Sequence, residues 1–414
     1  MNASSSSPAD EAAADIVPPD ALTMATIEEL ERAPEQRTWI QSATLLAISL
    51  GLFALTGFFN DSPTNIALTI GVLLLHELGH YAGMRLFNYQ DVRMFFIPFF
   101  GAAVAGRSRS VLGYKEAIVL LLGPLPGIAL GLVLGIVCLS VDSPTLRSAA
   151  LLLLLINAFN LLPFLPLDGG RLMHLVLFSR QPILEAVFRV LTGAVVVWFG
   201  WVSGGWFLAA MGVFLIVGTR QTYRVSRLGR QLRGPLHAGT EMDLTARIPR
   251  EQAIPLVELT RRHFPTAVLP KTLASIVRQV WERIHLRPPG LIASFAFLAL
   301  SGLAFIVAPL ALLVFHAPLT STQKRLAANG TAIQVREVRV WGRLQESTEL
   351  DSLGQPDGAH QEFYPHTSQL KVAGAYQKGR LHGTWKEYDE SGQLRSEREY
   401  RNGELVPEPA AENQ

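Results

Sequence analysis

Residues 71–80 read GVLLLHELGH, so two histidines and a glutamate follow a run of apolar residues. Residues four apart share one face of a helix, which places His76 and His80 together. Two imidazoles so placed can bind one zinc ion, and Glu77 beside them suits a general base. The alternative is two histidines hydrogen-bonded in a soluble core. It is disfavoured, because the flanks are apolar and an unpaired ionisable cluster in hydrocarbon is costly.

Asp168, in the stretch LPLDGG, is the residue best placed to complete such a site. A zinc ion that keeps one position for water needs a third protein ligand. The prolines of NLLPFLPLDGG (160–170) interrupt a helix there, and the glycines after Asp168 let backbones approach closely. Considered alone, Asp168 fits a helix cap as well as it fits a zinc ligand. Together with HELGH it is favoured as a ligand, whereas His174 is interpreted as an interfacial side chain.

The elements that must position these residues are apolar runs of about 20 residues, enough to cross a bilayer core. The chain has 414 residues, of which 49% are apolar and 17% charged. We predict an all-α polytopic membrane protein of about seven transmembrane helices, followed by a small β-repeat domain. The predicted spans lie near residues 38–59, 64–86, 115–140, 147–165, 184–201, 204–220 and 290–315.

Two stretches between these runs have a pattern of their own. FFIPFFGAAVAG (95–106) is apolar and punctuated by Pro and Gly, which fits either a membrane-dipping hairpin that pairs with an extended peptide or a re-entrant packing loop. In the third span, glycines recur every fourth residue, which predicts close contact between helices. These glycines are Gly123, Gly127, Gly131 and Gly135.

Lys and Arg are concentrated in alternate loops, which predicts orientation. Five lie between residues 85 and 115, Arg171 and Arg180 follow the fourth span, and thirteen lie in 220–289, whereas the alternate loops carry almost none. We expect a cytoplasmic N-terminus and an extracytoplasmic C-terminus, in a bacterial cytoplasmic membrane. The net charge of +2 gives no reason to expect nucleic acid as a partner.

The remaining segments are predicted from composition. Residues 1–37 are expected to be a disordered acidic tail, 38–220 a membrane core that contains the zinc site, and 221–289 a basic cytoplasmic helical segment. Residues 290–316 are the seventh helix, and 317–414 an extracytoplasmic region. Within the latter, YQKGRL at 376–381 recurs as YRNGEL at 400–405. This spacing predicts hairpins stacked into a small sheet.

HELGH in the second span, followed by NLLPFLPLDGG in the fourth, resembles the site-2 protease family over about residues 38–220. The family consists of intramembrane zinc metalloproteases. The resemblance implies that His76, His80 and Asp168 bind Zn²⁺ and that Glu77 activates water. Asn160 matches the family's asparagine upstream of the Asp, and is implied to hold substrate or the oxyanion. GPLPG at 123–127 is similar to the family's third-span segment.

The repeats at about 357–405 resemble MORN-type repeats of antitoxin-like proteins, which implies a binding surface for a protein partner. The function favoured is therefore an intramembrane metalloendopeptidase that cleaves membrane-anchored proteins in or near the lipid bilayer. Two alternatives remain. A membrane-anchored binding protein would use its metal structurally, with four protein ligands. A metal transporter would need further ionisable residues along a pathway through the spans.

Overall fold

The computed structural model describes residues 20–32, 62–97, 101–107, 112–233, 248–326, 332–365 and 367–407, with isolated residues at 40, 41, 44, 47 and 48. The chain divides into two compact units, each assembled from separate parts of the sequence. The first unit comprises Met1–Asn60, Leu73–Pro124 and Asn160–Gly302. The second comprises Asp61–Val72, Leu125–Phe159 and Leu303–Gln414.

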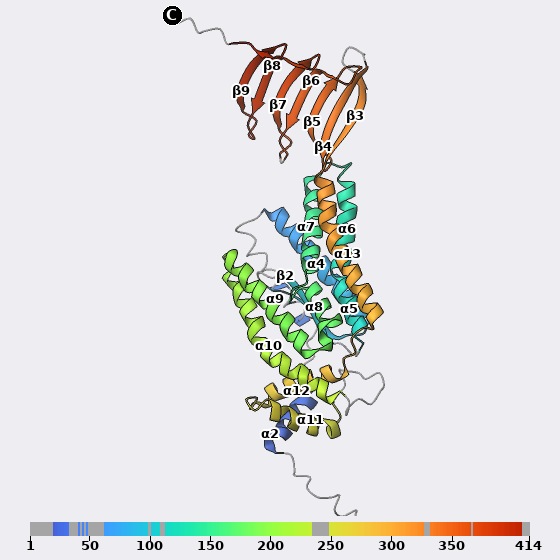
Figure 1. Cartoon of the computed structure of the whole chain (residues 1–414), viewed down its shortest axis with the longest axis vertical. Coiled ribbons are helices and arrows are strands. Elements are labelled where there is room, and N and C mark those ends of the chain that lie inside the picture. Colours follow the sequence, from blue (N-terminus) through green and yellow to red (C-terminus); the bar gives the residue numbers. More distant parts are fainter. Residues whose placement is uncertain are drawn as a thin grey trace, which may run out of the picture. The chain divides into compact units, whose positions relative to one another are not determined.

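Helices account for most of the chain before residue 317 (Figure 1). They are α2 (Ala21–Glu31), α4 (Pro63–Leu86), α5 (Gly113–Leu122), α6 (Pro124–Val137), α7 (Pro144–Asn160), α8 (Asp168–Val176), the short 3₁₀ helix η1 (Phe178–Arg180), α9 (Pro182–Val202), α10 (Trp206–Leu232), α11 (Arg250–His263), α12 (Pro270–His285) and α13 (Leu291–His316).

Among the described residues, four helical stretches are long and apolar enough to cross a membrane, as in an integral membrane protein. They are Pro63–Leu86, Gly113–Val137, Pro182–Val202 and Leu291–His316. The second of them comprises α5 and α6, which meet at Gly123.

The predicted count of seven spans is not supported. The expected span at 38–59 falls almost wholly outside the described residues. Helix α7 ends at Asn160 and is only 17 residues long, because the proline-containing stretch that follows turns away from a helix. The stretch expected at 204–220 is the apolar first half of α10, whose second half is rich in arginine. A helix that continues into charged residues is not confined to the bilayer.

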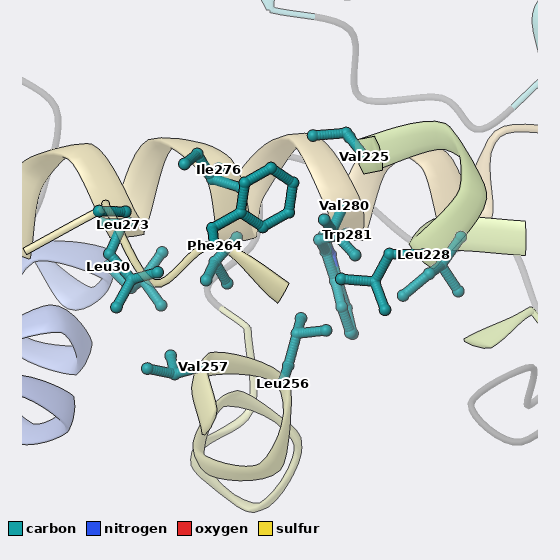
Figure 2. Close-up of a cluster of buried hydrophobic side chains, with 14 of the residues drawn as sticks. Leu30, Val225, Leu228, Leu256, Val257, Phe264, Leu273, Ile276, Val280 and Trp281 are labelled. Atoms are coloured by element: carbon teal, nitrogen blue, oxygen red, sulfur yellow. The ribbon is translucent and has the colours of Figure 1, made fainter. Parts of the chain in front are cut away.

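In the first unit, α9 and α10 pack side by side, and the end of α10 joins α2, α11 and α12 around one apolar core. Figure 2 shows this core, with Phe264 and Trp281 between the helices. Helix α2 corrects the expectation of a tail disordered as far as residue 37. Ile27 and Leu30 are buried in the core, and Arg278 donates to the Leu30 carbonyl oxygen. This apolar face gives α2 the burial that disordered segments lack.

Two strands form an antiparallel pair, β1 (Gln90–Ile97) and β2 (Gly101–Arg107). The pairing brings Phe96 opposite Ala102 and Ile97 opposite Gly101. Antiparallel strands are therefore present on either side of the turn expected in FFIPFFGAAVAG, whereas membrane dipping and pairing with a peptide stay predictions.

The second unit contains an eight-stranded antiparallel sheet whose strands lie in sequence order (Figure 1). The sheet begins at Pro318, directly after α13, and therefore includes strands that precede the repeats predicted at 357–405. The strands are β3 (Pro318–Leu326), β4 (Ala332–Val340), β5 (Arg343–Leu350), β6 (Pro356–Phe363), β7 (Leu370–Gln377), β8 (Arg380–Tyr388), β9 (Leu394–Arg401) and β10 (Glu404–Leu405).

The two copies of the sequence repeat occupy equivalent hairpins. YQKGRL contains the turn between β7 and β8, and YRNGEL contains the turn between β9 and β10. Each turn has two residues with positive φ, Lys378 and Gly379 in one and Asn402 and Gly403 in the other. Such turns match the twist of the strands they join, which explains why Gly recurs. The internal repeat is thus structural, and its likeness to MORN repeats stays a prediction.

The turn between β4 and β5 fixes the sheet to helices of the same unit. Trp341 is 2% exposed and donates its ring N–H to the Gly135 carbonyl oxygen, 3.2 Å away. Its ring stacks on Phe315 with centroids 5.5 Å apart. A Cβ on Gly135 would lie 2.1 Å from the Phe315 ring, and one on Gly131 would lie 2.9 Å from Leu154. The expected role of this glycine stripe in close helix contact is confirmed.

Candidate metal centre

Helix α4 brings His76, Glu77 and His80 to a protein-facing side. Their exposed fractions are 3%, 7% and 7%, whereas Leu78 between them is 54% exposed. The i, i+4 spacing predicted that the histidines share a face, and their rings lie 4.8 Å apart in a T-shaped arrangement. At this turn the helix therefore presents Leu78 outward and its ionisable side chains inward.

Asp168 is the first residue of α8 and is 7% exposed. A carboxylate in the first turn is stabilised by the positive end of the helix dipole. The chain between α7 and α8 folds back tightly on the start of α8. A Cβ on Gly169 would lie 2.0 Å from the Leu161 carbonyl oxygen, and one on Gly170 would lie 2.3 Å from the Phe164 carbonyl carbon. Only glycine permits both approaches, as expected from the sequence.

The three side chains converge on a small triangle of ligand atoms. His76 Nε2 lies 3.1 Å from Asp168 Oδ2, His80 Nε2 lies 3.0 Å from the same oxygen, and the two nitrogens are 3.2 Å apart. Zinc ligands at about 2.0–2.1 Å in tetrahedral geometry lie roughly 3.3 Å from one another. The triangle is therefore close to one face of a zinc coordination tetrahedron, and its donor set of two imidazoles and a carboxylate suits zinc.

A contact outside the triangle selects the tautomer of His80. Its Nδ1 lies 2.8 Å from the Val119 carbonyl oxygen in α5 and donates to it. With the proton on Nδ1, the lone pair of Nε2 points into the triangle, as a metal ligand requires. The ring fits only because the neighbouring residue is glycine, since a Cβ on Gly123 would lie 2.3 Å from His80 Nε2.

His174 belongs to a different cluster, in agreement with its omission from the predicted ligands. Its Nε2 lies 2.8 Å from Oε1 of Glu185 in α9. Glu185 is 1% exposed, accepts a hydrogen bond of 2.7 Å from Ser226 in α10, and is paired with Arg283 in α12. This cluster fixes the C-terminal part of α8 to three other helices.

Two asparagines lie on α7. Asn160, predicted from the family resemblance, is its last residue and is half-buried. Asn157 was not singled out, although it is fully buried in the second unit. Its amide donates to the Leu153 carbonyl oxygen at 2.7 Å, and a Cβ on Gly127 would lie 2.2 Å from the Asn157 nitrogen. An asparagine inside the run LLLLLINAFN was the signal, since an apolar helix seldom carries an amide without a partner.

Comparison with known proteins finds relatives among metalloproteases. The chain is 26% identical over 190 residues to a zinc metalloprotease of Methanocaldococcus jannaschii, covering 44% of this chain and 55% of that protein. It is 29% identical over 143 residues to stage IV sporulation protein FB of Bacillus subtilis, covering 34% of this chain and 49% of that protein. The chain thus spans about half the length of the curated relatives it matches.

Among solved structures, the chain is similar to the site-2 protease from Methanocaldococcus jannaschii, with a TM-score of 0.31 and 22% identity. This likeness covers 48% of this chain and 94% of that one. No family model matches the chain.

Proposed function

We infer that the chain belongs to the site-2 protease family, and we propose that it is a zinc-dependent intramembrane endopeptidase that cleaves membrane-anchored proteins. The observation that supports this most is the convergence of His76, His80 and Asp168 with the buried Glu77 beside them. Three protein ligands leave a coordination position for water, which a structural site with four ligands does not. The name of one curated relative, a zinc metalloprotease, agrees with this chemistry.

Each residue has a role that follows from its chemistry. His76, His80 and Asp168 would hold the zinc ion. When bound, zinc polarises a scissile carbonyl and lowers the pKa of water. Glu77 accepts a proton from the attacking water and returns it to the leaving amine nitrogen. Asn160 donates a hydrogen bond to the oxygen on which negative charge develops.

A peptide must be extended to be cut, because a helix shields its own carbonyl groups. The pair of strands β1 and β2 offers backbone edges to which an extended substrate can add as a further strand. In this proposal the main-chain hydrogen bonds of the added strand position the scissile bond.

The central experiment separates metal binding from proton transfer. Glu77→Gln should keep zinc and abolish cleavage, since only the base is lost. Asp168→Ala should lose both zinc and cleavage. Glu251→Gln, an exposed carboxylate on α11, is the matched control and should retain both. Zinc content is measured by elemental analysis, and substrates are found by comparing the membrane proteomes of cells with wild-type and Glu77→Gln protein. Full zinc and full activity in Asp168→Ala would reject the third ligand.

For topology, we propose a cytoplasmic N-terminus and an extracytoplasmic C-terminal sheet in a bacterial cytoplasmic membrane. Opposite sides for the two ends require an odd number of crossings, so this proposal includes at least one crossing before Arg233 in addition to the four long apolar stretches of the described residues. Helix α2 packs against α11 and α12, which suits a common side for the N-terminal segment and the basic segment. The sheet follows α13, which is long and apolar enough to span. A phosphatase reporter, active only outside the cytoplasm, should be inactive when fused after Arg233 and active after Leu326. Equal activity of the two fusions would reject this topology.

The C-terminal sheet is proposed to bind a protein partner and to control which substrates reach the site. Deleting residues 318–414 should leave zinc binding intact and change the rate on the natural substrate. Unchanged rates on that substrate and on a generic transmembrane peptide would reject the role.

A further inference from the structure

A pocket in the first unit gathers four arginines at one end of a predicted span. It lies where η1 leads into α9 and where the ends of α10 and α12 meet. Its lining residues are Ser179, Arg180, Pro182, Ser226, Arg230, Arg233 and Arg283. None of them is a proposed metal ligand, and the proposed proteolysis does not use the pocket.

The positive charge of this pocket is largely uncompensated. Arg283 is paired with the buried Glu185, but Arg180, Arg230 and Arg233 form no ion pair with any carboxylate in the described part of the chain. Their partners are neutral oxygens. Arg180 donates to the Pro289 carbonyl at 2.5 Å, and Arg233 donates to the carbonyls of α12's last turn. These bonds orient the guanidinium groups without neutralising them.

Arg233 is the clearest case of a pocket arginine whose charge is not neutralised. Its Nε is buried and has no hydrogen-bond partner among the described residues. Burial lowers the pKa of the Arg233 guanidinium, and the charges of Arg283 and Arg230 lower it further. A group in this situation gains most from an anion.

The N-terminus of helix α9 adds a positive electrostatic potential that favours an anion. The helix begins at Pro182, and its N-cap residue Gln181 makes no capping hydrogen bond with its side chain. The positive end of the helix dipole therefore lies at the pocket. Arginine forks match the geometry of phosphate oxygens.

We propose that this pocket binds a phosphate group, and that the headgroup of an anionic phospholipid is its source. Pro182, the first residue of the apolar stretch Pro182–Val202, lines the pocket, so a helix that crosses the bilayer here would place the pocket at a membrane surface. The next residues of α9, Ile183, Leu184 and Val187, are exposed by 66%, 49% and 49%. They provide an apolar surface for acyl chains beside the cationic pocket. A soluble phosphate would use the arginines but not these side chains.

The test titrates purified full-length protein in detergent with phosphatidylglycerol or phosphatidylcholine, and counts bound lipid by native mass spectrometry. Arg230 is the residue to change, because it is exposed and its hydrogen-bond partner within the described part of the chain is the Gln181 side chain. Arg227→Gln is the matched control, because it removes the same charge from an exposed position on the same helix outside the pocket. Thermal unfolding confirms that both variants are folded.

We expect tighter binding of phosphatidylglycerol than of phosphatidylcholine. Arg230→Gln should weaken the former about tenfold, the loss of one charge-assisted hydrogen bond. Arg227→Gln should bind as wild type does. In a second arm, inorganic phosphate is compared with chloride at equal ionic strength. Protection against thermal unfolding by phosphate, dependent on Arg230, would support the pocket and assign it to a soluble phosphate. Equal binding of both lipids without an effect of phosphate, or equal loss in both variants, would overturn the proposal.

Discussion

Replacing Gly123 with alanine tests whether the metal centre depends on the space left for the His80 ring. A Cβ at this position would lie 2.3 Å from Nε2 and 2.4 Å from Cε1 of that ring. Ordinary contact begins at 3.4 Å, so the ring must move by about 1 Å. Zinc–ligand distances tolerate changes of only ~0.2 Å. The substitution should therefore remove His80 from the geometry in which it binds zinc.

The size of the effect can be bounded. Overpacking in a close-packed site costs about 1–3 kcal/mol, whereas alanine gains at most about 1 kcal/mol over glycine in a helix. Disturbing a metal ligand through its surroundings lowers affinity about 10–100-fold. Gly71→Ala, on α4, is the matched control, since nothing lies within 4 Å of its added Cβ. The control should be neutral or slightly stabilising.

The assay is zinc competition with a chelator, performed on purified full-length protein and accompanied by thermal unfolding. Gly123→Ala should lose zinc at a lower chelator concentration than Gly71→Ala and wild type. Wild-type zinc affinity in Gly123→Ala, with an unchanged unfolding temperature, would refute the reasoning. Either His80 would then not be a ligand, or the contact between α4 and the junction of α5 and α6 would not be as close as described.

Three further predictions concern packing. Glu185→Gln leaves Arg283 without its buried counter-charge and should lower the free energy of unfolding by about 3–5 kcal/mol, measured by chemical denaturation. Leu30→Ala removes a side chain that α2 buries, at a cost of about 2–5 kcal/mol, and should make the segment before residue 33 more sensitive to limited proteolysis. A Cβ on Gly374 would lie 2.4 Å from the Trp385 ring, so Gly374→Ala should change tryptophan fluorescence and destabilise the sheet by about 1–3 kcal/mol. Normal protease resistance in Leu30→Ala, or unchanged fluorescence in Gly374→Ala, would contradict these contacts.

The residues of the candidate site could be predicted from the sequence because they are ionisable residues within apolar runs. Histidine, glutamate and aspartate in apolar runs are costly, so their positions alone predicted that His76, His80 and Asp168 meet. The partner of His80 was not predictable, because Val119 contributes a backbone oxygen, and every residue carries one. The same limit applies to Gly123, whose role depends on which ring lies beside it.

The sequence predicted which kinds of secondary structure the chain forms, but it was less accurate for the number and the bounds of the elements. Apolar run length identified α4, α9 and α13 as helices, but it overestimated the spans, since α10 continues from apolar residues into an arginine-rich half. Helix α2 was missed because the prediction rested on the acidic, Ala- and Ser-rich composition of the whole N-terminal segment, within which Leu22, Ile27 and Leu30 form only a short apolar face. Its burial is supplied by α11 and α12, more than 200 residues later in the chain. Hairpin turns, by contrast, are local, and the repeated Gly revealed them.

Helix α8 links the metal centre to the basic segment that follows the membrane core. At its N-terminus, Asp168 lies at hydrogen-bond distance from both histidines of α4. Toward its C-terminus, His174 contacts Glu185, which Arg283 of α12 also contacts. A helix of nine residues held at both ends has little freedom to move Asp168 alone. Six of its nine residues are buried, so α8 is also packed between these two contacts.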